Sequence, residues 1–167
     1  MRIGVPREIK VLENRVGLTP GSVREVVAHG HQVVVEHNAG QGIGMDDEAY
    51  RKAGATIAGT AAEVFAAADM VVKVKEPQAG ERKLLRPGQV LFTYLHLAPD
   101  PEQAADLVAS DAVCIAYETV TSASGGLPLL APMSEVAGRM AIQAGAYYLE
   151  KPHGGGIERQ RCEAAIL

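Results

Sequence analysis

Two apolar runs near the middle of the sequence constrain its fold most strongly. The run MVVKVK, residues 70–75, is dense in β-branched residues and stops at the turn-forming pair Glu76-Pro77. The run VLFTYLH, residues 90–96, is almost wholly apolar and stops shortly before Pro99. Short, nearly continuous apolar runs bounded by turn residues are typical of strands buried on both faces, as in a parallel sheet.

Similar runs alternate with helical segments over the first 118 residues. Thr19 and Pro20 mark a helix start, and Gly30 is placed to end that helix. We expect strands at 2–6, 32–38, 70–75, 90–96 and 111–118, and helices at 20–29, 46–54, 61–68 and 101–110. The connections are too long for hairpins. The alternation predicts an α/β fold with an open, parallel, doubly wound (Rossmann-like) sheet and flanking helices.

Composition narrows the classes of partner. The chain has 167 residues, enough for a sizeable core, and a formal net charge of -4 with no basic stripe, which argues against nucleic acid. Its two cysteines predict neither a disulfide framework nor a metal cluster. We find no secretory signal and no apolar stretch near twenty residues, so we expect no membrane association and a cytoplasmic location.

Lys75 and His96 close the two central apolar runs. Ligands of open α/β sheets bind beyond the carboxyl ends of the strands, so a cation and a proton-transfer group there suggest a site. Each residue also has a plainer interpretation. A lysine at a strand end is usually a solvated charge, and such a histidine is more often hydrogen-bonded and structural. Arg15 lies in a long polar loop, where an arginine is more often a surface residue.

Two glycine-rich stretches resemble functional motifs but do not match them. Residues 40–44, GQGIG, lie between a strand and a helix, yet the dinucleotide pattern G-x-G-x-x-G would need glycine where Met45 stands. We interpret this stretch as a turn. The HGGG stretch at 153–156 is like a lipase oxyanion loop, but the chain has no G-x-S-x-G. His29 and His31 flank a turn without the further ligands of a metal site.

Beyond residue 119 the alternation stops. A Ser/Gly/Pro-rich connector precedes one long helix, for which Ser134 is the expected N-cap, and Val136, Met140 and Tyr147 give that helix an apolar stripe. We expect the stripe to be covered by another copy of the chain, making a homo-oligomer. The predicted domains are 1–130, a substrate and catalytic domain; 131–152, a connecting helix; and 153–167, a tail.

Several segments together carry a family resemblance. MRIGVPREIKVLENRVGLTP, VVKVKEP, LFTYLHLAPD, IAYETV, LPLLAPMSEVAGRMA and GAYYLEKPHGG run in order from Met1 to about Gly155. Together they resemble NAD-dependent alanine dehydrogenase, which converts L-alanine to pyruvate and ammonium with reduction of NAD. The related transhydrogenase alpha subunit matches the first segment as closely. The Y-L-H run and the intact PMSEVAGR favour alanine dehydrogenase.

The resemblance implies roles for four residues. Arg15 and Lys75 would bind the substrate, His96 would be the catalytic acid/base, and Ser134 would contact the NAD cofactor. These roles suit the chemistry of a 2-oxo acid. A guanidinium binds a planar carboxylate through two hydrogen bonds, an ammonium can polarise a carbonyl, and an imidazole exchanges protons near neutral pH.

The final residues depart from the family. The resemblance implies a complete NAD-binding domain after PHGG, whereas GGIERQRCEAAIL does not align with one. We therefore expect a truncated chain that is inactive by itself and shows no measurable binding of NAD. The alternatives are a non-catalytic module that binds an oxo acid or self-associates, and a fragment of the transhydrogenase alpha subunit.

Overall fold

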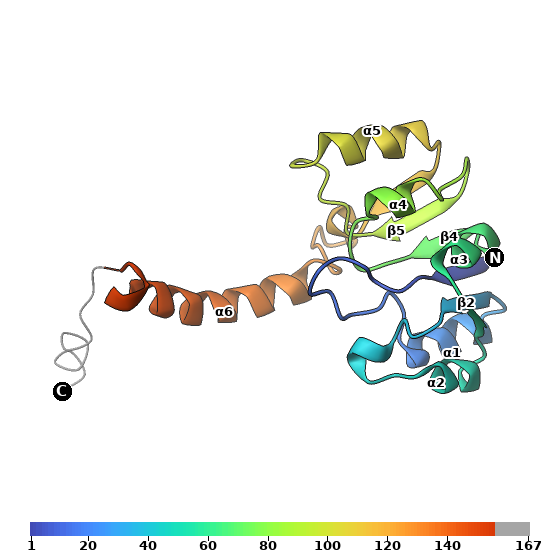
Figure 1. The fold of residues 1–167 in the computed structure, drawn as a ribbon, viewed down its shortest axis with the longest axis horizontal. Coiled ribbons are helices and arrows are strands. Elements are labelled where there is room, and N and C mark those ends of the chain that lie inside the picture. The colour runs from blue at the N-terminus through green and yellow to red at the C-terminus, as the bar shows by residue number, and fades with distance from the viewer. Residues whose placement is uncertain (156–167) are drawn as a thin grey trace. The chain divides into compact units, whose positions relative to one another are not determined.

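A six-stranded sheet with every strand parallel organises the first part of the chain. The computed structural model describes residues 1–155, which form two compact units, the first being Met1–Thr119 and the second beginning at Val120. The strand order is β3-β2-β1-β4-β5-β6, shown in part in Figure 1. The strands are β1 Arg2–Val5, β2 Gln32–Glu36, β3 Thr56–Ala58, β4 Met70–Val72, β5 Val90–Thr93 and β6 Val113–Ala116.

Helices connect successive strands, as parallel pairing requires. They are α1 Pro20–Ala28, α2 Asp47–Lys52, α3 Ala61–Ala67, α4 Ala79–Arg82, α5 Pro101–Ala109 and α6 Ala131–Leu149, with 3₁₀ turns η1 Gln41–Ile43, η2 Tyr117–Thr119 and η3 Lys151–His153. The predicted parallel α/β sheet is confirmed. The sequence-based prediction missed β3 and α4, which are short and carry no marked periodicity.

All five predicted strands are shorter than expected, and two of these differences concern the proposed site. β4 ends at Val72 and β5 at Thr93, so Lys75 and His96 each lie three residues beyond a strand rather than in its last position. The predicted helix caps at Thr19 and Thr60 are confirmed. The Thr19 and Thr60 side chains accept backbone N–H groups of α1 and α3, and Gly30 after α1 has φ +84°, a conformation that favours glycine.

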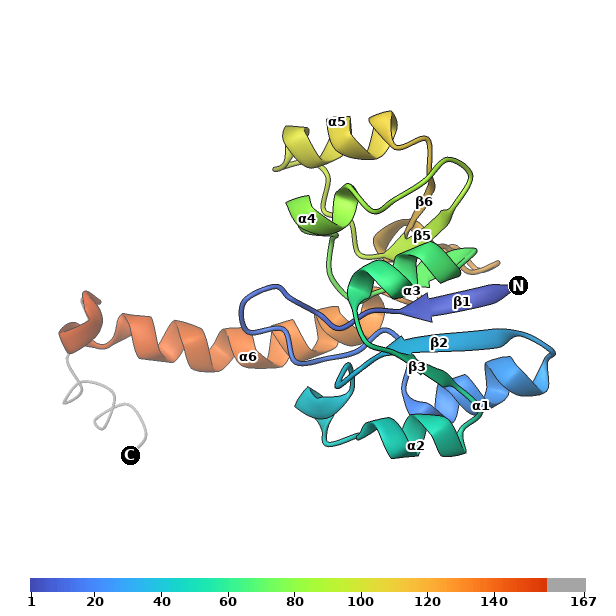
Figure 2. The ribbon, with the colours of Figure 1, turned by 45° about the vertical axis from the view of Figure 1, so that its right-hand side comes forward.

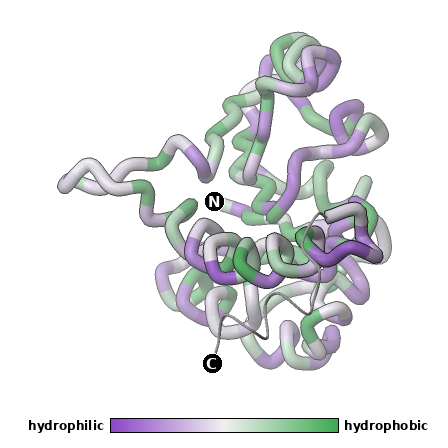
Figure 3. The backbone as a smooth tube through the Cα atoms, turned by 90° about the vertical axis from the view of Figure 1, so that its left-hand side faces the viewer, coloured by the Kyte–Doolittle hydropathy of each residue, from purple (hydrophilic) through white to green (hydrophobic). Residues whose placement is uncertain are grey.

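The core is built mainly from valine and alanine. One buried cluster includes Val23, Val33, Val35 and Tyr50, and a second includes Phe65, Val71 and Leu91. α1 and α2 contact one another, and α1 packs beside β2 (Figure 2). Figure 3 shows hydrophobic and hydrophilic residues on α5, the helix at the top of that view. Such amphipathic helices cover the sheet with one face and meet solvent with the other.

The long helix predicted after the connector is present in the second unit, but its expected start was wrong. α6 begins at Ala131 with a proline in its first turn, so Ser134 lies inside the helix and is not its N-cap. Proline is well suited to a first helical turn, because the amide it lacks has no partner there. The boundaries at 130/131 and 152/153 stay predictions. Residues 156–167 of the predicted tail lie outside the described residues.

Candidate active site

The sheet topology brings Arg15 and Lys75 onto neighbouring loops. β1 and β4 pair side by side, and the chain winds outward from them in opposite directions, through β2 to β3 and through β5 to β6. Such a reversal of strand order opens a crevice at the carboxyl ends of the two strands. Arg15 lies in the loop after β1, which extends past the strand's end in Figure 2, and Lys75 follows β4. His96 follows β5, the next strand along.

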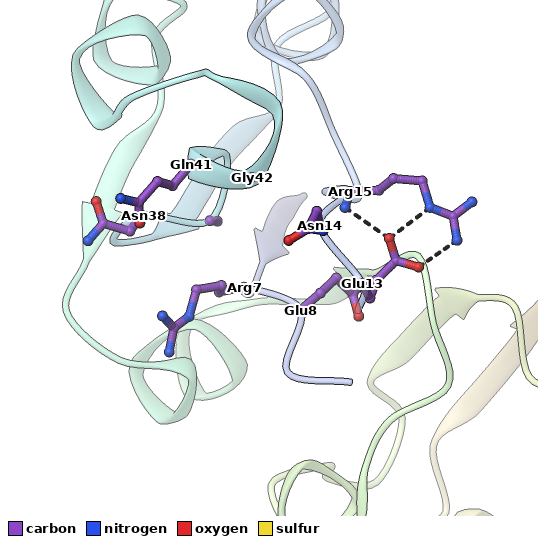
Figure 4. Close-up of a pocket in the computed structure, with 9 residues that line it drawn as sticks. Arg7, Glu8, Glu13, Asn14, Arg15, Asn38, Gln41 and Gly42 are labelled. Carbon is purple, nitrogen blue, oxygen red and sulfur yellow. Dashed lines mark hydrogen bonds and ion pairs between the residues drawn. The ribbon is translucent and has the colours of Figure 1, made fainter. Parts of the chain in front are cut away.

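Glu13 holds the Arg15 side chain. Glu13 Oε1 accepts the Arg15 Nε–H at 2.8 Å and its backbone N–H at 2.9 Å, while Oε2 accepts Nη2 at 2.5 Å. The hydrogen bond from the Arg15 side chain lowers the pKa of Glu13 against the opposing effect of burial, and attraction to Lys75 lowers it further. In Figure 4 the Arg15 guanidinium points away from Asn38 and Gln41. The Glu13 carboxylate is therefore close enough to Arg15 and Lys75 for both cations to lower its pKa.

Glu8, from the same loop as Arg15, anchors the backbone around Lys75. Its Oε1 accepts the N–H of Val74 at 2.6 Å and, more weakly, that of Lys75 at 3.4 Å. Its Oε2 receives a hydrogen bond from Lys73 Nζ at 3.2 Å. Burial raises the pKa of Glu8, although Lys73 opposes that shift. The carboxylate thus ties the loop of Arg15 to the loop of Lys75.

Lys73 is fully buried, unlike the half-buried Lys75. Its ammonium lies between Glu8 and Glu81, at 3.2 and 2.7 Å, and its side chain is 0% exposed. The sequence-based analysis treated it as part of an apolar strand and missed this ion cluster. A lysine flanked by valines inside an apolar run was the available signal, because a buried ammonium requires carboxylate partners.

His96 is exposed and adopts an uncommon backbone conformation, with φ +48°. Its backbone N–H donates to Glu118 Oε1 at 2.8 Å, and its ring stacks on Tyr94 with centroids 6.1 Å apart. Tyr94 also contacts Tyr117 edge-on, and burial raises the pKa of the Tyr117 hydroxyl. The sequence-based analysis assigned no role to Glu118, although an acidic residue following β6 at this edge of the sheet was a usable signal.

Ser134 lies on α6 in the second unit and is exposed. Within residues 1–155, no side-chain contact of Ser134 indicates a function. Its cofactor role therefore remains an expectation from the family resemblance.

A cavity of about 320 Å³ lies beside Arg15. Its lining is mainly polar and comes from the loops after β1 and β2: Arg7, Glu8, Glu13, Asn14, Arg15, Asn38, Ala39, Gln41 and Gly42 (Figure 4). Lys75 and His96 are not among the lining residues. The cavity is therefore lined by one of the three proposed substrate and catalytic side chains, Arg15.

The glycine-rich stretch after β2 packs against the protein itself. A Cβ on Gly42 would lie 2.4 Å from the Asn14 carbonyl oxygen, and one on Gly40 would lie 2.6 Å from the Tyr50 ring. The stretch forms the 3₁₀ turn η1 rather than the start of a helix whose free N–H groups could bind a pyrophosphate. These residues do not fit a dinucleotide, in agreement with the interpretation as a turn.

Residues 1–155 contain neither a metal-binding cluster nor a membrane-spanning helix. No group of three or more His, Cys, Asp or Glu side chains there is arranged to hold a metal ion. No helix in this range has the length and apolar character needed to span a membrane.

Comparisons with known proteins identify the family of this chain. The family model described as "Alanine dehydrogenase/PNT, N-terminal domain" matches residues 4–137. Alanine dehydrogenases from Bacillus subtilis and Methanococcus maripaludis are 57% and 56% identical over 155 residues, which is 93% of this chain but 40% and 42% of theirs. The chain thus spans about two fifths of the length of these relatives.

Solved structures of an alanine dehydrogenase and of a transhydrogenase are both similar to this chain. An L-alanine dehydrogenase superposes with a TM-score of 0.83 at 49% identity, covering 93% of this chain and 43% of its own. A transhydrogenase from Sinorhizobium meliloti superposes less closely, with a TM-score of 0.66 at 31% identity over 71% of this chain and 35% of its own. The similarity to the alanine dehydrogenase is the stronger of the two.

Proposed function

Because the chain belongs to the alanine dehydrogenase/PNT N-terminal domain family, we propose that it is the substrate-binding portion of an NAD-dependent alanine dehydrogenase. The reaction is the reversible oxidative deamination of L-alanine to pyruvate and ammonium. The observation that carries the proposal is the position of the Arg15 and Lys75 loops on either side of the point where the strand order reverses, with the His96 loop beside them.

Arg15 and Lys75 bind the substrate in this proposal. The planar guanidinium of Arg15 recognises the carboxylate that alanine and pyruvate share. Lys75 donates to the carboxylate and to the carbonyl oxygen of pyruvate, which makes the carbonyl carbon more electrophilic. Both residues lie near the Glu13 carboxylate, which supports a place between them where a small anion gains from two positive charges.

His96 transfers protons in this proposal. Exchange of the amino group for oxygen requires a group that accepts a proton from water and returns it to the departing nitrogen. An imidazole nitrogen performs both steps near neutral pH. The exposed position of His96 keeps its ring accessible to substrate and water.

The nicotinamide cofactor supplies hydride transfer in the family reaction. We propose Ser134 as one contact to it, but a single hydroxyl contributes about 1 kcal/mol, whereas millimolar affinity needs about 4 kcal/mol. Residues 1–155 also offer no fitting glycine loop. We therefore propose that this chain alone binds an oxo acid without binding NAD measurably. An assay for NADH formation from L-alanine separates this non-catalytic role from turnover.

Calorimetric titration with pyruvate tests the proposed substrate site. The wild-type chain should bind pyruvate saturably, and Arg15→Ala should abolish binding because the carboxylate loses its guanidinium partner. Arg24→Ala is a matched control, because Arg24 is exposed on α1, away from the strands' carboxyl ends. Unchanged affinity in Arg15→Ala would refute the proposed substrate site.

We also propose that the chain forms a homo-oligomer through α6. Val136, Met140 and Tyr147 are 53%, 60% and 49% exposed, an apolar set that association would cover. Sedimentation should show concentration-dependent association that Met140→Glu weakens. Val108→Glu, at an apolar α5 residue 83% exposed, is the control. A monomer across the micromolar range contradicts the proposal.

A further inference from the structure

The backbone at His96 has a conformation that needs support from its surroundings. Its φ of +48° lies in the left-handed region, which side chains other than glycine rarely adopt. Residues held in such conformations persist only where neighbouring groups determine the backbone, and they cluster at functional sites. The residues that hold His96 in place are therefore candidates for a functional role.

Glu118 supplies most of that support. Its two carboxylate oxygens accept the Leu95 N–H at 3.0 and 3.2 Å, and Oε1 also accepts the His96 N–H at 2.8 Å. The carbonyl oxygen of Leu95 is held as well, because Gln103 Nε2 donates a hydrogen bond to it at 2.6 Å. Gln103 is 1% exposed and lies on α5, whereas Glu118 lies in η2 after β6. Two separate elements thus fix the backbone that leads into His96.

The charge of Glu118 is consistent with this arrangement. Burial by itself raises the pKa of Glu118, but hydrogen bonds from backbone N–H groups, first that of His96, and attraction to His96 outweigh it, so the pKa is lowered. A carboxylate that is ionised makes stronger hydrogen bonds to N–H groups than a neutral acid does.

We propose that Glu118 is a positioning residue for His96: it locks the left-handed backbone at residue 96 and so fixes the place from which the imidazole meets the substrate. The proposal rests on the proposed function, because it assumes that His96 acts on a substrate bound by Arg15 and Lys75. It adds a role for the IAYETV segment, whose glutamate binds the backbone that leads into His96.

NMR spectroscopy of the labelled chain tests this proposal with pyruvate as the probe. The His96 ring signal is assigned by its loss in His96→Asn. In the wild type, pyruvate should shift that signal. In Glu118→Gln, which keeps the shape but removes the charge and one acceptor, pyruvate affinity should change by less than about threefold, as for an ordinary surface substitution. The pyruvate-induced shift of the His96 ring signal should fall to less than about half, because the ring is no longer held in place.

Two matched variants accompany this measurement. Glu118→Asp restores the charge on a shorter side chain and should recover part of the His96 response. Glu48→Gln, at an exposed carboxylate on α2, should leave both affinity and response unchanged. A full His96 response in Glu118→Gln overturns the proposal.

A second readout needs neither pyruvate nor a folded variant. As the wild type is acidified, the Leu95 and His96 amide signals should move together when Glu118 is protonated, below the ordinary pKa of a glutamic acid, and the His96 ring signal should move with them. A ring signal that stays still through that transition overturns the proposal. If wild-type chain fails to bind pyruvate, the proposed function fails, while this acid titration still decides whether Glu118 positions the imidazole.

Discussion

Glu13 and Arg15 form a side-on ion pair in which both carboxylate oxygens meet the guanidinium, at 2.8 Å from Nε and 2.5 Å from Nη2. The Glu13 side chain is only 6% exposed. A substrate carboxylate bound at Arg15 would therefore lie close to a second, nearly buried carboxylate belonging to the protein. This neighbour should limit how tightly the site binds an anion.

Glu13→Gln should therefore tighten pyruvate binding. The amide keeps the shape and one acceptor for Arg15 but removes the charge, and relief of a repulsion of about 1 kcal/mol lowers Kd about fivefold. Calorimetric titration measures the change, with Glu48→Gln on exposed α2 as the control. Weaker binding would instead show that the Glu13 charge is needed to orient Arg15.

Lys73→Met should destabilise the fold strongly. The substitution leaves Glu8 and Glu81 buried next to each other without their shared cation, and breaking a buried pair in this way costs about 3–5 kcal/mol. Denaturant unfolding gives the change, and Lys83→Met at an exposed position should be nearly neutral. If Lys73→Met lowered the free energy of unfolding by less than about 1 kcal/mol, as is typical of a surface ion pair, the cluster of Lys73, Glu8 and Glu81 would have to be solvated.

Gly42→Ala, in the 3₁₀ turn after β2, should disturb the loop that carries Arg15. The added Cβ would lie 2.4 Å from the carbonyl oxygen of Asn14, the residue before Arg15, so one of the two loops must move. We expect a loss of about 1–3 kcal/mol in stability together with weaker pyruvate binding. Gly80→Ala, with open space around its Cβ, is the control for thermal unfolding and calorimetry. Normal affinity in Gly42→Ala would mean that the loops are independent.

Stability should depend on pH through Glu118. Its pKa in the folded state is lowered, so its ionised form binds the backbone more favourably than its protonated form does. The resulting stabilisation is present above the pKa of the unfolded state and is lost as pH falls through the lower, folded-state pKa. In denaturant unfolding across the acid range, the free energy of unfolding of the wild type should exceed that of Glu118→Gln at neutral pH, and this difference should shrink as the pH falls. A difference in the free energy of unfolding that does not change with pH would contradict a stabilising role for ionised Glu118.

Several elements could be predicted from local patterns. The β1 and β2 strands, the caps at Thr19 and Thr60 and the helix α5 follow from apolar runs, hydroxyl caps and an initial proline. The start of α6 was misjudged because Ser134 is a good cap in isolation, yet Pro132 permits the helix to begin earlier. β3 was missed because three residues offer too short a pattern for the period of a strand to stand out.

The amino-acid sequence by itself determined the parallel α/β class, and the order of its strand-like and helical runs together with its motifs pointed to Arg15, Lys75 and His96. Periodicity and capping are local properties, and the motifs are contiguous, so both can be found in one dimension. Only the tertiary structure decided that Glu13 pairs with Arg15, that Glu8 ties Lys73 to the Arg15 loop, and that Glu118 holds the backbone at His96. The last two contacts join residues 65 and 22 positions apart, so their partners come together only when the sheet forms. The burial of Lys73, which makes a carboxylate partner necessary, likewise arises only then.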